Sequence, residues 1–234
     1  MNTIFWKGVF STTIDGLLIS ELPPISKPPL RVKETAIDGR DGSVFEELGY
    51  SSYDKSITIG LRGNFDINKV IKYFTGEGKI IVSNEPDKVY TAKVIEQIDY
   101  NRLVRFRTAV VKFRVQPYKH KHLEAYKEIQ ASTLEEASFE VFNEGMETSK
   151  PIMVLHGNGT VGISVNGIHI FDYTFPEGET EVVIDSEKED AYLGDVLKNR
   201  NMNGEFPTLL SGTNIIEWSG YVESIEILPR SRWL

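Results

Sequence analysis

The chain contains no cysteine and no long apolar run. Without cysteine it can form neither a disulfide nor a thiolate metal site. No window approaches the ~20 consecutive apolar residues that a membrane-spanning helix needs. The N-terminal sequence from Met1 to Lys7 also lacks the charged and then apolar layout of a secretory signal peptide. We therefore expect a protein that is made in a cytosol and is not exported by the general route.

Side chains suited to catalysis are also scarce. The segment Gly162–Gly167 misses the G-x-S-x-G nucleophile motif and lies in an expected strand–turn–strand, where that motif needs a strand, a turn and a helix. Gly157–Gly159 precedes an expected strand, so it does not form a phosphate-binding loop. The carboxylates show no pair in the partly apolar setting of a glycosidase. We predict no catalytic residue, no cofactor and no enzyme activity.

The charge is unevenly divided along the chain. Residues 1–130 hold 20 basic and 16 acidic residues, whereas residues 131–234 hold 6 basic and 18 acidic residues. Such a shift indicates two domains with different surroundings. The acidic half should repel nucleic acid and anionic lipid, and the first half is too mildly basic to predict a DNA-binding protein.

The first half predicts strands with one helix among them. Pro23-Pro24 and Pro28-Pro29 indicate a stiff extended connector, because proline fixes φ and has no backbone donor. An alternating strand begins at Leu30, and Gly39–Gly42 supplies turn residues after it. Apolar side chains then recur at helical spacing over 67–75, with Asp66 as N-cap and Gly76 after the end.

Two long strands, 89–97 and 103–115, are expected to form an extended hairpin with its tip near Asn101. The apolar positions change parity along the second strand, which predicts a β-bulge near 109–111 or a change of face. The hairpin is rich in basic residues, and Arg105 and Arg107 are expected on one strand face.

Polar sequence and the charge shift predict a linker at 117–132. It separates a domain of residues 1–130 from a domain of residues 131–234. The second domain shows short apolar runs between glycine and asparagine turns, which is typical of an antiparallel β-sandwich. We expect its strands at 134–142, 151–156, 160–165, 168–174, 180–184, 213–218 and 222–228. The predicted fold class is mainly β, between all-β and β-rich α+β.

Two polar runs are candidate metal sites, and for both a solvated surface is the better interpretation. In Lys119–His122 the lysines would repel a dication from the two histidines. The acidic residues between Asp185 and Asp195 do not have the spacing of an EF-hand loop. We therefore predict no metal site.

Three groups of motifs, in this order along the chain, resemble the distal tail proteins of phages with long non-contractile tails. They are Gly39–Gly42 followed by Tyr50; Pro151–Gly167; and Asp185-Ser186 through Gly204–Pro207, Leu210–Asn214 and Trp218–Gly220 to the Arg-Trp-Leu end. Glycine-rich turns are common, so each motif alone is weak and the order and spacing carry the resemblance.

The resemblance implies a structural baseplate hub at the virion tail tip. The first domain would form a homo-hexameric ring, with a galectin-like sandwich from the second domain on its periphery. The ring would surround the channel through which the genome passes, without sequence-specific DNA binding. Implied partners are the tail tube protein, the tape measure protein and tail-associated or receptor-binding proteins, and no membrane.

Ring contacts are expected from the helix 67–75 and the basic hairpin 89–115, because exposed strand edges suit pairing between subunits. The expected interface residues are Val70, Phe74, Arg102, Arg105, Arg107, Lys112 and Arg114.

Two alternatives remain open from the sequence. Trp218 and Trp233 could stack on sugars in a carbohydrate-binding module for host cell-wall glycans, although the polar cluster of galectins is not recognisable. The basic residues of the hairpin 89–115 could bind DNA, although this segment lacks interleaved aromatic residues for stacking on single strands.

Overall fold

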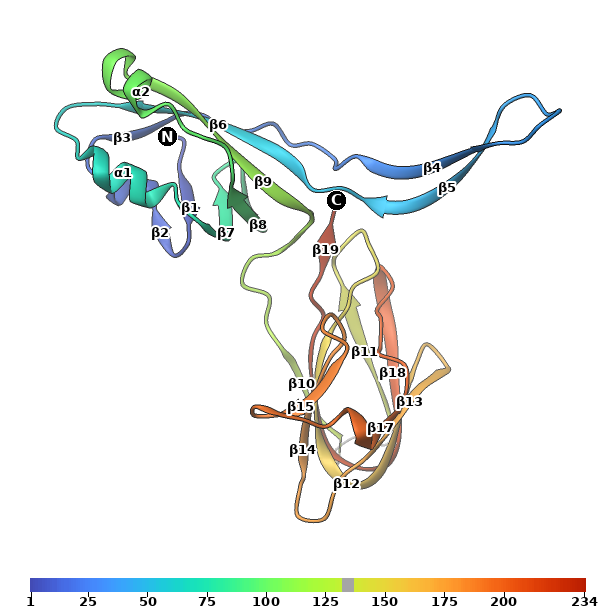
Figure 1. Ribbon diagram of the computed structural model, residues 1–234. Coiled ribbons are helices and arrows are strands. Elements are labelled where there is room, and N and C mark those ends of the chain that lie inside the picture. The colour runs from blue at the N-terminus through green and yellow to red at the C-terminus, as the bar shows by residue number, and fades with distance from the viewer. Residues whose placement is uncertain (132–136) are drawn as a thin grey trace. The chain divides into compact units, whose positions relative to one another are not determined.

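The computed structural model describes residues 1–131 and 137–234. Its contacts divide the chain into a first unit, Met1–His122 with Leu234, and a second unit, Leu123–Trp233. Strands dominate both units, and the α-helices of the described residues are two short ones in the first unit (Figure 1). The prediction of a mainly β protein is confirmed.

The first unit is built on an antiparallel sheet with the strand order β2-β1-β7-β8-β9-β6-β3. Apolar side chains at alternate strand positions form its core, in which the ring of Trp6 packs edge-on against Phe113 with 5.0 Å between centroids. The strands and helices of this unit are β1 (Ile4–Trp6), β2 (Val9–Phe10), β3 (Leu17–Glu21), β4 (Leu30–Ala36), β5 (Ser43–Tyr50), β6 (Tyr53–Leu61), α1 (Ile67–Tyr73), β7 (Glu77–Val82), β8 (Glu85–Val94), α2 (Tyr100–Phe106) and β9 (Thr108–Lys121).

Helix α1 forms where its capping residue predicts it. The Asp66 carboxylate accepts hydrogen bonds from the backbone N–H groups of Asn68 at 2.9 Å and Lys69 at 3.4 Å, which satisfies two donors of the first turn. The helix ends at Tyr73, and Gly76 follows with a positive φ of 88°.

The expected hairpin tip near Asn101 is wrong. Residues 100–106 form helix α2, which Asp99 caps by accepting from Arg102 N–H at 2.8 Å and which ends at Arg107 in the left-handed region. The helix also explains why the apolar positions of the expected strand 103–115 change parity, because the first of them, Val104 and Phe106, belong to α2 and not to a strand. Strand β9 pairs regularly with β6 over Thr108–Val115, without the expected bulge.

The second unit is an antiparallel sheet with the order β10-β18-β12-β14-β15-β16, to which β11 adds at β18 and β13 at β12. Part of the expected strand 134–142 lies outside the described residues. The strands of this sheet are β10 (Lys127–Gln130), β11 (Ser138–Asn143), β12 (Ile152–Val165), β13 (Ile168–Thr174), β14 (Glu181–Asp185), β15 (Asp190–Leu193), β16 (Val196–Leu197), β17 (Met202–Gly204) and β18 (Gly212–Leu228). The short strand β19 (Arg232–Trp233) follows them in the chain and is not part of this sheet.

Two pairs of expected strands are in fact single long strands, β12 and β18. Each bends, and the pairing between them shifts register around Gly157 and between Asn158 and Gly162. The first part of β12 pairs with β14 and the last part with β13, so the sheet curls around the second core. The expected linker 117–132 also holds strand residues, since β9 runs to Lys121 and β10 begins at Lys127.

The bend in β18 depends on Gly220. Its φ is 86°, and an added Cβ would overlap the carbonyl oxygen of Thr160. We expect Gly220→Ala to lower the free energy of unfolding by about 2 kcal/mol or more, since backbone strain and the overlap add. Gly212→Ala is the matched control, with a φ of 92° and no atom within 4 Å of its Cβ. Urea unfolding measures both, and equal losses would show that the close approach to Thr160 has no effect.

Candidate assembly interface

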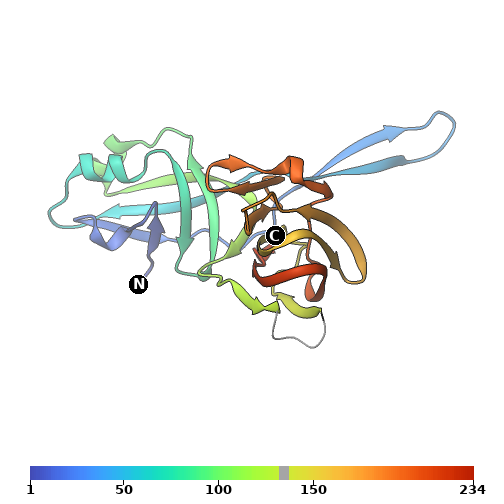
Figure 2. The same cartoon turned by 90° about the horizontal axis from the view of Figure 1, so that it is seen from below.

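Strands β4 and β5 form a hairpin that pairs with no other strand of the described residues, which we call the arm (residues 30–50). All seven residues of β4 are exposed, and so are most of β5. In Figures 1 and 2 the arm, drawn in blue, extends away from the sheet of its own unit. The arm was expected as strand and turn but not as an interface.

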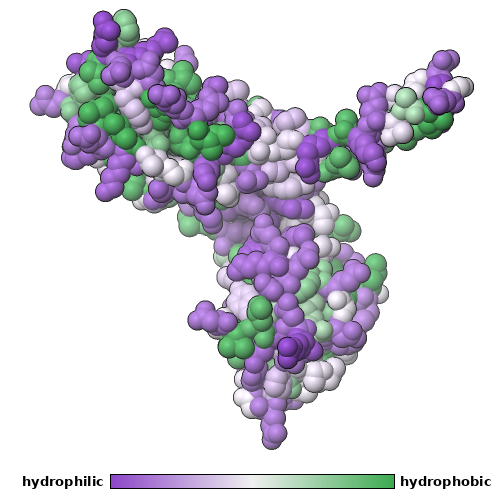
Figure 3. Space-filling view, in the orientation of Figure 1, coloured by the Kyte–Doolittle hydropathy of each residue, from purple (hydrophilic) through white to green (hydrophobic). Residues whose placement is uncertain are grey.

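The register of the arm places apolar and charged side chains together on both of its faces, and Figure 3 shows this mixture on the side toward the viewer. Phe45 lies opposite Glu34, and Val32 lies opposite Glu47. The exposed apolar residues include Phe45, 62% exposed, and Val32, 48% exposed. An isolated two-stranded hairpin is marginally stable in water, and its two edges present unpaired backbone groups. The arm therefore has the properties of a segment that packs against a partner.

A groove of about 450 Å³ lies beside β1 and the edge strand β2 of the first unit. The rings of Phe5 and Phe10 lie 4.8 Å apart between centroids, and Phe10 is 53% exposed. The other lining residues are Thr3, Ile81, Ser83, Pro86 and His122. An apolar groove beside a sheet edge is a second surface that can receive a strand or an apolar side chain.

Val70 and Phe74 do not lie on a surface. They are 0% and 2% exposed and pack in the core of the first unit. Their helical spacing arises from the face with which α1 covers the sheet, so their assignment as interface residues is wrong.

The five predicted basic residues separate into two groups. Arg102, Arg105 and Arg107 lie on α2 or at its end and are exposed, so Arg105 and Arg107 do not share a strand face. On β9, Lys112 pairs with Glu96 at 2.9 Å and Arg114 with Asp54 at 2.6 Å. Neighbouring carboxylates thus neutralise two of the five basic residues that were expected at the interface.

The run Lys119–His122 is not a solvated linker. Lys119 belongs to β9, is 6% exposed, and its ammonium lies 2.6 Å from the Glu85 carboxylate. Burial of the lysine in this strand explains why the polar sequence misled the prediction.

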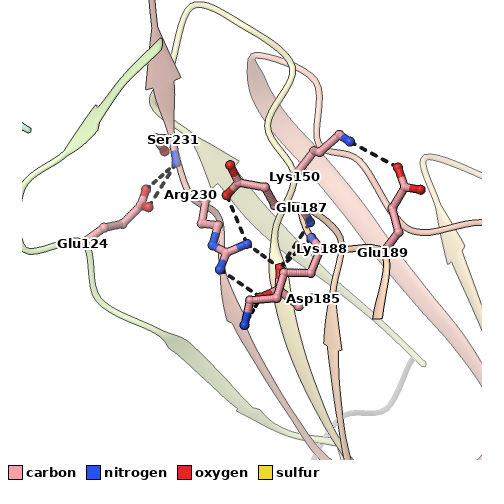
Figure 4. A network of polar contacts seen from close by, with 8 residues as sticks. All are labelled: Glu124, Lys150, Asp185, Glu187, Lys188, Glu189, Arg230 and Ser231. Atoms are coloured by element: carbon pink, nitrogen blue, oxygen red, sulfur yellow. Dashed lines mark hydrogen bonds and ion pairs between the residues drawn. The ribbon is translucent and has the colours of Figure 1, made fainter. Parts of the chain in front are cut away.

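The acidic loop is solvated as expected at Glu187, Glu189 and Asp195, but Asp185 is buried (Figure 4). Arg230 contacts both of its carboxylate oxygens, at 2.5 and 3.1 Å. The backbone N–H groups of Glu187 and Lys188 donate to the same carboxylate. Burial alone would raise the pKa of Asp185, but the guanidinium and these N–H groups outweigh it and hold the pKa below its usual value. Asp185 therefore fixes the C-terminal segment of the second unit.

The same segment is held by Glu124. Its carboxylate accepts the backbone N–H of Ser231 with both oxygens, at 3.1 and 3.0 Å (Figure 4). Among the described residues no group of three or more acidic or histidine side chains is arranged to hold a metal ion.

Trp218, a residue on which the carbohydrate alternative rests, packs beside the core of the second unit. Its ring lies 6.0 Å from that of Phe139 between centroids. In the part of the chain that the structure describes, neither α1 nor α2 is long enough to cross a membrane.

Comparison by sequence finds no matching family model and no matching curated protein. Comparison by structure finds the crystal structure of the SPP1 Dit protein, described as a paradigm of the hub adsorption apparatus in phages that infect Gram-positive hosts. That match has a TM-score of 0.75 with 14% identity and covers 97% of both chains. This chain has the fold of a phage hub protein. The baseplate of phage P2 in its activated conformation with Ca also matches, with a TM-score of 0.48, 8% identity and 97% of both chains covered.

Proposed function

We propose that the protein is a structural hub of a phage tail tip and not an enzyme. The observation that carries the proposal is the match in fold to the SPP1 hub protein over 97% of both chains. The motifs in the sequence independently point to the same family. On this proposal the protein joins the tail tube to the adsorption apparatus at the virion tail tip.

We propose that the first unit closes a homo-hexameric ring around the channel through which the genome passes. A closed ring needs two different complementary surfaces on each copy. The arm and the groove beside β1 and β2 supply such a pair, since the arm exposes apolar side chains, the groove is lined by others, and both lie on the same unit. Docking would cover the apolar side chains of the arm and pair its exposed edges. The second unit would then lie on the periphery of the ring, and the proposed partners of the assembled hub are the tail tube, tape measure and receptor-binding proteins.

The mass of the protein in solution tests this proposal. Light scattering is expected to show a species of about six times 26.5 kDa, which negative-stain microscopy shows as a ring. Measurement at two protein concentrations separates a closed ring from open filaments, whose mass keeps growing. A chain that stays monomeric at both concentrations would contradict self-assembly through the arm.

A further inference from the structure

The segment between β3 and the arm, residues 22–29, cannot continue the sheet. Its two proline pairs, Pro23-Pro24 and Pro28-Pro29, have no backbone N–H to donate to a neighbouring strand. Strand β3 accordingly stops pairing with β6 at Glu21. Some other contact must hold the segment, because the direction in which the arm leaves the unit depends on it.

Side-chain donors from the neighbouring strand and turn bind the carbonyl oxygens of this segment instead. The Asn84 amide donates to the carbonyl oxygen of Pro23 at 3.0 Å, and the Lys55 ammonium donates to that of Pro24 at 3.1 Å. The Tyr53 hydroxyl lies 3.4 Å from the Ser26 carbonyl oxygen. Lys55 and Tyr53 come from the same face of β6, so the segment is fixed to the sheet at successive points.

Lys55 is itself held by a buried cluster. It is 4% exposed, and its ammonium lies 3.9 Å from the Glu85 carboxylate, which pairs with Lys119 at 2.6 Å and accepts the hydroxyl of Tyr90. Burial raises the pKa of Tyr53 to about 12, with a further contribution from Glu85, so this hydroxyl keeps its proton and can donate to Ser26.

The cluster holds two ammonium groups and one carboxylate, so one positive charge is left over. The Lys55 ammonium faces the Pro24 carbonyl and lies 4.7 Å from the centroid of the Tyr90 ring. Burial lowers the pKa of Lys55, against the opposite effect of Glu85. A buried charge of this kind contributes little net stability, whereas it can fix one arrangement of the chain.

We propose that Lys55, Glu85 and Lys119 form a latch that sets the direction of the arm. By fixing residues 22–29, the latch removes conformational freedom that docking would otherwise have to remove, and so strengthens assembly. Its role in assembly rests on the proposed ring, whereas its effect on the arm does not. Lys55 is a positioning residue, since it acts through the connector and not at the docking surface.

Lys55→Met tests the latch, because it removes the donor to Pro24 and leaves Glu85 and Lys119 as a one-to-one ion pair. Methionine has a volume similar to that of lysine, so the packing is kept. The control is Lys93→Met on β8. It breaks an exposed ion pair in which the Lys93 ammonium lies 3.1 Å from the Glu77 carboxylate. Spin labels go on two introduced cysteines, Arg40→Cys in the arm and Lys79→Cys on β7, and the absence of native cysteine makes the labelling specific. Val32→Thr and Phe45→Thr are added to keep the labelled chain monomeric.

The distance between the labels is expected to be narrowly distributed in the parent and in Lys93→Met, and broad in Lys55→Met. Without the arm substitutions, Lys55→Met should need a protein concentration about tenfold higher than the parent to assemble. Its thermal unfolding midpoint should be unchanged or higher. Should Lys55→Met fail to fold, Tyr53→Phe loosens only the contact with Ser26 and should broaden the distribution less. A narrow distribution in these variants, or a broad one in the parent, would overturn the latch. A parent that never assembles would instead contradict the ring and leave the label distances to decide the latch.

Discussion

Replacing Val32 and Phe45 with threonine is expected to turn the assembled protein into monomers. Both side chains lie on one face of the arm and are largely exposed in the single chain. Docking would remove them from water, and burial of each is worth roughly 1.5–3 kcal/mol. The double variant should therefore need at least about 100-fold more protein to assemble. Threonine keeps the strand propensity, so the hairpin itself should persist.

Glu34→Thr is the matched control for this prediction. It introduces the same residue on the same face, directly opposite Phe45. Sedimentation velocity over a range of concentrations measures all three proteins. If the double variant assembles as readily as the parent, apolar burial on this face of the arm does not hold the subunits together.

A mixing experiment identifies the surface that receives the arm. Phe10→Thr alters the groove and leaves the arm intact, so it should also be monomeric by itself. A mixture of Phe10→Thr with the double arm variant has one intact arm and one intact groove, and a heterodimer should form. If arms instead dock on arms, Phe10→Thr will assemble normally and the mixture will gain nothing.

The arm shows what sequence reasoning could and could not reach. Alternation from Leu30 and the turn residues at Gly39–Gly42 correctly predict the first strand of the arm and its turn, whereas the second strand, β5, was not predicted. The isolation of the arm was not predictable, because alternation normally implies one buried face. Here Phe45 shares a face with Glu34 and Glu47, and only the register between the strands reveals this mixture.

Other errors arose where tertiary context overrides local pattern. Lys55 and Lys119 look like solvent-facing residues, yet period-2 counting from Ile57 places Lys55 on the core face of β6. That signal was present in the sequence. The local sequence does not predict the Glu85 carboxylate that lies between the two ammonium groups, because Glu85 belongs to a different strand.

A shared fold is compatible with low sequence identity, because the fold constrains the pattern of residues more than their identity. A β sheet specifies alternation, turn residues and bends such as that at Gly220, and many side chains satisfy these constraints. At 14% identity the SPP1 protein can keep the pattern while most residues differ. Searches that compare residues then find no match, although the architecture of the whole chain is retained.

Arg230→Met is expected to lower the free energy of unfolding of the second unit by about 3–5 kcal/mol at neutral pH, because it leaves the buried Asp185 carboxylate without its partner. Lys188→Met removes another cation 3.5 Å from the same carboxylate, but this lysine side chain is 61% exposed and should cost less than about 1 kcal/mol. Combining Arg230→Met with Asp185→Asn should restore part of the loss, since the amide carries no charge. Urea unfolding followed by tryptophan fluorescence measures the series, in a Trp6→Phe background so that the signal comes from the two tryptophans of the second unit, Trp218 and Trp233.

Acid should reduce the difference between Arg230→Met and the parent. In the parent the pKa of Asp185 is lowered, so its stabilisation is complete above the usual carboxyl pKa and disappears as the pH falls through the lower folded value. Without Arg230 the effect of burial is opposed only by the N–H groups of Glu187 and Lys188 and by the exposed Lys188 ammonium, so the carboxylate should take up its proton at a higher pH than in the parent and the variant should lose less stability in acid. Both changes act in the same direction once the pH lies below the usual carboxyl pKa of about 3.9, so the loss at about pH 3 should be clearly smaller than at pH 7. An equal loss at the two pH values would mean that Arg230 acts through packing and not through the charge of Asp185.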